Sequence, residues 1–124
     1  MATVKPFKAV RPHKSKVALV SSKSYEIYTP EMLNSKLAFN PYTFLHVINP
    51  GYKYHKQDIS GELRFKLVHN RYLEFKEDKI FTQDKSPAFY IYQKTTATNV
   101  FCGIIPATSV DDYNNNIIKK HEET

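Results

Sequence analysis

Two apolar, aromatic-rich runs near the C-terminus constrain the fold of this chain more than any other feature. The first covers residues 88–94 and the second residues 100–105, and a short polar connection joins them. Runs of this length and composition predict β-strands, and so short a connection predicts an antiparallel hairpin. Apolar side chains fall on both faces of each run, so we expect both faces to be buried.

Two helices are predicted from their boundaries and their periodicity. Residues 29–31 (Thr-Pro-Glu) form a helix start, because threonine caps, proline suits the first helical position and glutamate complements the helix dipole. The residue before Pro41 is pushed out of the helical region, so this helix is predicted over residues 30–39. Apolar residues three and four apart predict a longer helix over about residues 57–77.

Three more segments predict short strands. Residues 4–10 alternate weakly and contain a proline, which is typical of an edge strand, while residues 17–20 and 43–48 are apolar runs of strand length. With the hairpin and the two helices, these segments predict an α+β fold with a mostly antiparallel sheet. At 124 residues, the chain is predicted to be a single domain over residues 1–124.

Composition excludes several classes of protein. With only 3 glycines, a glycine-rich phosphate loop is not expected. The formal net charge is +6, but the lysines and arginines are scattered and no nucleic-acid motif is present, so we predict no specific nucleic-acid partner. No apolar run approaches the length of a membrane span, so no membrane partner is predicted.

The single cysteine and the N-terminal sequence predict a cytoplasmic protein. Cys102 cannot form an internal disulfide, and its place in the second strand of the hairpin predicts a small buried apolar residue. Lys5, Lys8 and Arg11 interrupt any apolar core of a signal peptide.

The 5 histidines show no metal-ligand spacing, so no metal site is predicted from them. His46 lies within the apolar run of residues 43–48, where a hydrogen-bonded core histidine is the more frequent outcome. We keep His46 as a candidate substrate- or phosphate-binding residue beside that interpretation.

The densest set of ionisable side chains follows the hairpin. It contains Lys119, Lys120, His121 and Glu122, and Ser109 opens a short helical turn just before it. A neighbouring imidazole and carboxylate can act as a base and its orienting group, or hold a metal with help from elsewhere. The plain alternative is a solvated charged segment.

Four motifs in order resemble the N-terminal part of the uncharacterised bacterial and archaeal family called "domain of unknown function 1015". The resemblance spans nearly the whole chain. It is carried by residues 4–12 (VKPFKAVRP), 40–47 (NPYTFLHV), 83–92 (QDKSPAFYIY), and 110–113 (VDDY) followed by 117–122 (IIKKHE).

The resemblance implies that this chain is the N-terminal portion of a longer protein. Family members carry, further downstream, a histidine-rich segment similar to one in free serine kinases of the ParB and sulfiredoxin type, and their genes often lie beside serine-biosynthesis genes. The resemblance therefore implies a phosphotransferase-like protein for a small molecule of the serine or phosphoserine type. It implies an ATP-dependent kinase, with ATP and Mg²⁺, only in the full-length protein, so this chain is not expected to be active alone.

Under this hypothesis, Glu122 is the general base or a metal-facing carboxylate, with His121 beside it. Lys119 and Lys120 neutralise phosphate as point charges. The alternative is a non-catalytic binding or scaffolding module, because a hairpin that is apolar on both faces can pack on the rest of a longer protein or form a homo-oligomer. A third hypothesis is weak nucleic-acid binding through the net charge, which salt dependence would reveal.

Overall fold

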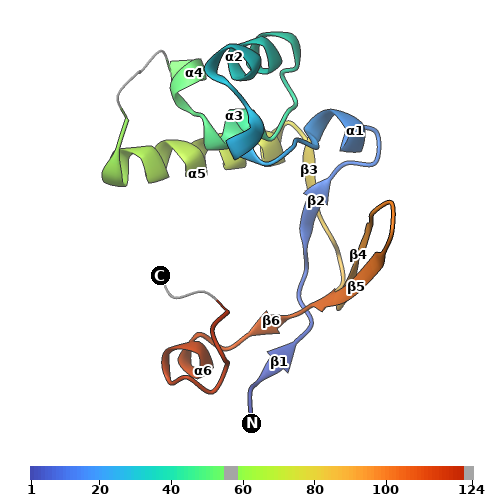
Figure 1. Cartoon of the computed structure of the whole chain (residues 1–124). Helices are drawn as coiled ribbons and strands as arrows, with labels where there is room; N and C mark the ends of the chain where they lie inside the picture. The colour runs from blue at the N-terminus through green and yellow to red at the C-terminus, as the bar shows by residue number, and fades with distance from the viewer. Residues whose placement is uncertain (55–58, 122–124) are drawn as a thin grey trace. The chain divides into compact units, whose positions relative to one another are not determined.

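The computed structural model describes residues 1–54 and 59–121 and has an α+β fold, as predicted (Figure 1). Its helices and small antiparallel sheets divide between two compact units. The central unit is Val10–Thr82, and the terminal unit combines Met1–Ala9 with the chain from Gln83 onward. The single domain over residues 1–124 stays a prediction.

The central unit is mainly helical. Its strands β2 and β3 pair with each other, and just beyond β2 the backbone N–H of His13 donates to the carbonyl of Ile80 at 2.7 Å. From Val10 onward the elements are β2 (Val10–Pro12), α1 (Val17–Val20), the 3-10 helix η1 (Tyr25–Ile27), α2 (Pro30–Phe39), α3 (Leu45–Ile48), α4 (Gly51–Tyr54), α5 (Gly61–Glu77) and β3 (Phe81–Gln83).

The core of the central unit joins α1, α3, α5 and β3. Phe75 on α5 and Phe81 on β3 pack edge to face, with ring centres 5.2 Å apart, an arrangement that adds to the stabilisation from burial alone. The buried members of this core are Val20, Val47, Phe75, Ile80 and Phe81, with Val10, Tyr42, Val68 and Tyr72 packed against them.

Both predicted long helices are confirmed. The Oγ1 atom of Thr29 caps α2 by accepting a hydrogen bond from the backbone N–H of Met32 at 3.2 Å, and α2 covers Pro30–Phe39 as predicted. The second helix, α5, covers Gly61–Glu77, so it begins later than predicted; residues 57 and 58 lie outside the described residues.

The C-terminal end of α5 is closed by a left-handed residue. Lys79 has a φ of 58°, and its N–H bonds to the carbonyl of Lys76 at 3.1 Å. The N–H of Ile80 bonds to the carbonyl of Phe75 at 2.9 Å. These two bonds form a Schellman motif, which usually places glycine where Lys79 lies. The motif turns the chain so that Ile80 enters the core.

Two predicted strands are helical instead. Residues 17–20 form α1, with the N–H of Val20 bonded to the carbonyl of Lys16, and residues 43–48 contain α3. Both runs are short and apolar, and periodicity cannot separate a buried strand from a buried helical turn over such a length. Local helical hydrogen bonds, rather than bonds along a neighbouring strand, hold both runs, and one further bond joins them, from the N–H of Phe44 to the carbonyl of Val20 at 3.0 Å.

A polar network links α4 to α5. The carboxylate of Glu74 accepts hydrogen bonds from Lys53 Nζ at 2.7 Å and Tyr54 Oη at 2.9 Å, and it pairs with the buried Arg71. Burial raises the pKa of Glu74, but the hydrogen bonds from Lys53, Arg71 and Tyr54 outweigh it and lower the pKa to about 2. Any stability that this shift contributes is therefore fully present above the ordinary pKa of 4.5 and is lost as the pH falls from there through about 2.

The terminal unit brings together the two ends of the chain. β1 (Val4–Lys5) pairs antiparallel with β6 (Ala107–Thr108), and Phe7 forms a single antiparallel bridge with Ala88. The Tyr90 hydroxyl accepts a hydrogen bond from the N–H of Ala9 at 2.9 Å. The first nine residues therefore run along segments that follow them by 81 to 109 positions.

The hairpin forms as predicted, but its faces are not buried. β4 (Tyr90–Thr95) pairs antiparallel with β5 (Val100–Ile105). Ile91 is 80% exposed and its cross-strand partner Ile104 is 69% exposed. The expectation of burial on both faces is wrong for this chain, because no element in its described part covers these side chains.

Cys102 is exposed, so its prediction as a buried residue is also wrong. It lies opposite Gln93, on the same face of the hairpin as Ile91 and Ile104, and it shares the exposure of that face. Among the described helices, none has the length and apolar character that crossing a membrane requires.

The left-handed residue at the end of α5 generates a stability prediction. Lys79→Gly is expected to raise the free energy of unfolding by about 0.5–1 kcal/mol, because glycine adopts a positive φ without the steric cost that lysine carries. Glu77→Gly, inside the same helix, is the matched control and should lower it by about 1 kcal/mol. Urea unfolding followed by circular dichroism measures both, and a less stable Lys79→Gly protein would contradict this account of the helix end.

Candidate functional site

A short capped helix leads into the charged segment that the sequence singles out. The Oγ atom of Ser109 accepts a hydrogen bond from the N–H of Asp112 at 3.3 Å and caps α6 (Val110–Asn114). The carboxylate of Asp112 accepts a hydrogen bond from the N–H of Thr3 at 2.7 Å, and its carbonyl accepts one from Ile117 at 2.9 Å. The residues that lead into the charged segment are thereby held against α6, and α6 is bonded to Thr3, just before the N-terminal strand.

The structure places the predicted basic groups together on the surface of the terminal unit. Lys119, Lys120 and His121 are exposed, and the Nζ atom of Lys120 lies 4.6 Å from the ring centre of Tyr113 on α6. Glu122 lies outside the described residues. His46 belongs to the central unit, so within one unit the structure groups only the two lysines and His121.

His46 is buried and hydrogen-bonded, but it lies on α3 rather than on a strand. Its Nε2 atom is 3.0 Å from the carbonyl oxygen of Leu37 and 3.1 Å from that of Asn40. Both partners only accept, so we assign the proton to Nε2, which donates. This leaves Nδ1 as the nitrogen through which His46 could contact a ligand, and its role in phosphate binding stays a prediction.

The surroundings of His46 favour the neutral imidazole. Burial lowers the pKa of His46, and the nearby positive charge of Arg71 lowers it further, while the hydrogen bonds to Asn40 and Leu37 act in the opposite direction. The ring packs edge-on against Tyr52, with centres 5.4 Å apart. His46 therefore behaves as a positioning residue that ties the end of α2 to α3.

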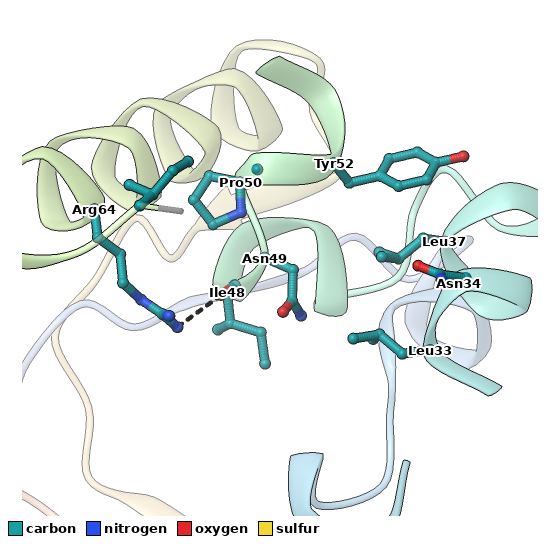
Figure 2. A pocket seen from close by; sticks show the side chains of 10 residues that line it. Leu33, Asn34, Leu37, Ile48, Asn49, Pro50, Tyr52 and Arg64 are labelled. Carbon is teal, nitrogen blue, oxygen red and sulfur yellow. Dashed lines mark hydrogen bonds between the residues drawn. The ribbon is translucent and has the colours of Figure 1, made fainter. Parts of the chain in front are cut away.

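A pocket of about 510 Å³ lies within the central unit, and its lining includes Leu37 and Tyr52, which also contact His46. In Figure 2, Leu33, Asn34 and Leu37 of α2 stand on one side, Arg64 of α5 reaches in from the other, and Ile48 and Asn49 lie between them. The residues that line it are Leu33, Asn34, Leu37, Ile48, Asn49, Pro50, Gly51, Tyr52, Ile59 and Arg64.

Among the described residues that line this pocket, Arg64 is the charged one. Its Nη2 atom donates to the carbonyl of Ile48 at 3.1 Å, the bond drawn as a dashed line in Figure 2. The side-chain amide of Asn49 is oriented by donating from Nδ2 to the carbonyl of Leu45 at 2.9 Å. The sequence alone did not predict this pocket. Arg64 looks like a solvated helix residue, and residues 49–51 look like a turn.

The described residues also form a second concavity, but they form no cluster of metal ligands. A second concavity of about 560 Å³ in the central unit is lined almost entirely by apolar and aromatic side chains, including Phe44, Phe65 and Tyr72. Across residues 1–54 and 59–121, no three side chains of His, Cys, Asp or Glu converge so that they could hold a metal ion.

The burial of His46 generates a pH prediction. Its pKa is lower in the folded than in the unfolded chain, so the stability it contributes is present above about pH 6.5 and is lost as the pH falls through the folded value. His46→Gln should therefore be less stable than the wild type at neutral pH, by about 1–2 kcal/mol, and this gap should narrow as the pH falls.

Urea unfolding at several pH values measures the gap. His69→Gln removes an exposed imidazole from α5 and serves as the control, with a smaller loss expected at neutral pH. A gap between the wild type and His46→Gln that stays constant or widens on acidification would contradict the lowered pKa.

Comparison with curated proteins and with solved structures found no match to this chain. A family model described as "Protein of unknown function (DUF1015)" matches residues 4–124. This range contains all four of the motifs that carry the resemblance described from the sequence. The chain therefore belongs to the DUF1015 family of proteins of unknown function.

Proposed function

We propose that this chain is the N-terminal portion of a phosphotransferase-like protein that acts on a small molecule of the serine or phosphoserine type. In this proposal the chain supplies phosphate-binding and acid–base groups and is not active alone. The enzymatic activity, an ATP-dependent kinase reaction, belongs to the full-length protein.

The observation that supports the proposal is the exposed cluster of basic residues that follows α6. Lys119 and Lys120 lie beside each other in sequence with His121 next, and all three side chains are open to solvent. Solvated lysines bind phosphate as flexible point charges, whereas lysines used in packing bury their stems. The bonds made by Asp112 hold the residues just before Lys119 in place, which favours a defined position for the charges.

The acid–base role falls on His121 and Glu122. Glu122 acts as the general base or as a metal-facing carboxylate, with the imidazole of His121 beside it. For Glu122 this assignment rests on the sequence and the resemblance, because the residue lies outside the described part of the chain.

ATP and Mg²⁺ enter the proposal through the full-length protein. The lysines suit the phosphates of a nucleotide, but the described residues do not bring together three ligands for a metal ion. No catalytic step through ATP or Mg²⁺ is therefore assigned to this chain. A cytoplasmic location is part of the same proposal.

A second candidate function is a non-catalytic binding or scaffolding module. The exposed hairpin favours it, because Ile91 and Ile104 on one face and Tyr92 and Phe101 on the other remain more than half exposed. Exposed apolar groups gathered on one element mark an interaction surface. The hairpin would pack on a further part of the protein or on a second copy of the chain.

Kinetics on a full-length family member with ATP and serine test the first function. Replacing the equivalent of Glu122 with glutamine should lower kcat by about 100-fold or more, because the general base is removed. Replacing the equivalent of Lys120 with alanine should lower kcat/KM for ATP by about tenfold. The equivalent of Lys66, an exposed lysine on α5, is the control and its removal should leave both parameters unchanged. Full turnover in the glutamine variant would refute the assignment.

Light scattering over a range of concentrations tests the second function. If the hairpin self-associates, the wild-type chain should form particles of more than one copy, and Ile91→Lys should return them to monomers by placing a charge in the apolar contact. Gln93→Lys adds the same charge on the same face without removing an apolar group, so it should disturb association less. A wild-type monomer that binds no apolar dye would count against this function.

A further inference from the structure

We propose that the pocket between α2 and α5 binds a small aliphatic carboxylate that carries a hydrogen-bond donor, such as a short branched 2-hydroxy or 2-amino acid. The site lies in the central unit and uses none of Lys119, Lys120 and His121. It is therefore independent of the function proposed for the terminal unit.

The size and the lining of the pocket fit a small organic molecule. Its volume of about 510 Å³ lies within the usual range of about 300–1,000 Å³ for small-molecule sites. Such sites combine apolar walls with a few polar groups that fix the orientation of the ligand. Here the apolar walls are Leu33, Leu37, Ile48, Pro50 and Ile59.

Arg64 supplies the charge that selects a carboxylate. One arm of its guanidinium is fixed by the bond from Nη2 to the carbonyl of Ile48, which holds the group at the wall of the pocket. A guanidinium has five N–H donors in a planar fork that matches the two oxygens of a carboxylate. Arg64 is the one positive charge among the described lining residues, which suits a monoanion better than a phosphate dianion, since a dianion usually recruits several donors and cations.

The two asparagines supply the second polar contact. The amide of Asn49 is held by its bond from Nδ2 to the carbonyl of Leu45, so its Oδ1 atom remains able to accept from a ligand. Asn34 lines the wall on α2, opposite Arg64 (Figure 2). A ligand with a donor near its carboxylate, as in a 2-hydroxy or 2-amino acid, would satisfy Arg64 and an asparagine together.

A methyl-detected NMR titration of the chain tests this proposal. The probes are 2-hydroxyisovalerate, valine, the uncharged isovaleramide and inorganic phosphate. The two carboxylates should shift the methyl signals of Leu33 and Ile48 with Kd values on the order of 1 mM, as expected for ligands of so few atoms. Isovaleramide should bind at least about tenfold more weakly because it lacks the charge that Arg64 recognises.

Variants locate the site and separate charge from shape. Arg64→Gln should weaken carboxylate binding by about tenfold or more, and Arg64→Lys should recover only part of it because the planar fork is lost. Lys66→Gln removes an exposed charge two positions along α5 and should change nothing. Leu33→Phe, which fills the pocket without touching its charge, should also weaken binding. Circular dichroism confirms that each variant is folded.

Three results would overturn the proposal. The first is an absence of methyl shifts at about 20 mM of either carboxylate, well above the expected Kd. The second is equal binding of the amide, or tighter binding of phosphate, which would refute the class of ligand. The third is unchanged affinity in Arg64→Gln. None of these results bears on the kinase assay, which reports on the equivalents of Lys120 and Glu122.

Discussion

The helical unit depends on the capture of the carbonyl groups at the end of α2. Four backbone carbonyls at a helix C-terminus have no partner within the helix, and a buried end needs partners from elsewhere. His46 satisfies two carbonyls in this region, those of Leu37 and Asn40, and the side chain of Asn40 reaches the carbonyl of Leu19 at 2.7 Å. These bonds fix α1, α2 and α3 against one another. The walls of the pocket stand on two of these elements, so its shape follows from the same bonds.

Local signals explain which parts of the fold the sequence could predict. The cap at Thr29, the proline at the start of α2 and the spacing of apolar residues on α5 each act within a few residues of chain, and both helices are confirmed. The runs at 17–20 and 43–48 carry no such signal. Val20 of the first run and Val47 of the second are buried by residues of α5 and β3, which lie far along the chain, whereas Val17 and Leu19 stay exposed. Composition alone therefore predicts strands for both runs. The exposure of Ile91 and Ile104 likewise depends on what surrounds the hairpin.

The charged segment and the pocket also differ in how far the sequence could predict them. Lys119, Lys120 and His121 are neighbours in sequence, so their grouping could be read directly, and the structure adds their exposure and the anchoring by Asp112. The pocket draws on residues between 33 and 64, from the four helices α2, α3, α4 and α5 and from the loops beside them, none of which is unusual by itself. Arg64 gains significance only because α5 packs so that its side chain meets the carbonyl of Ile48.

The pairing of β1 with β6 has a consequence for how the protein is made. During synthesis, Val4 and Lys5 leave the ribosome about a hundred residues before their partners Ala107 and Thr108. The central unit, whose contacts fall within Val10–Thr82, can form in that interval, whereas the pairing of β1 must wait until Thr108 has been translated. Until then the first strand is an unpaired edge, and the charges of Lys5 and Lys8 and the backbone of Pro6 disfavour its mispairing with other nascent chains.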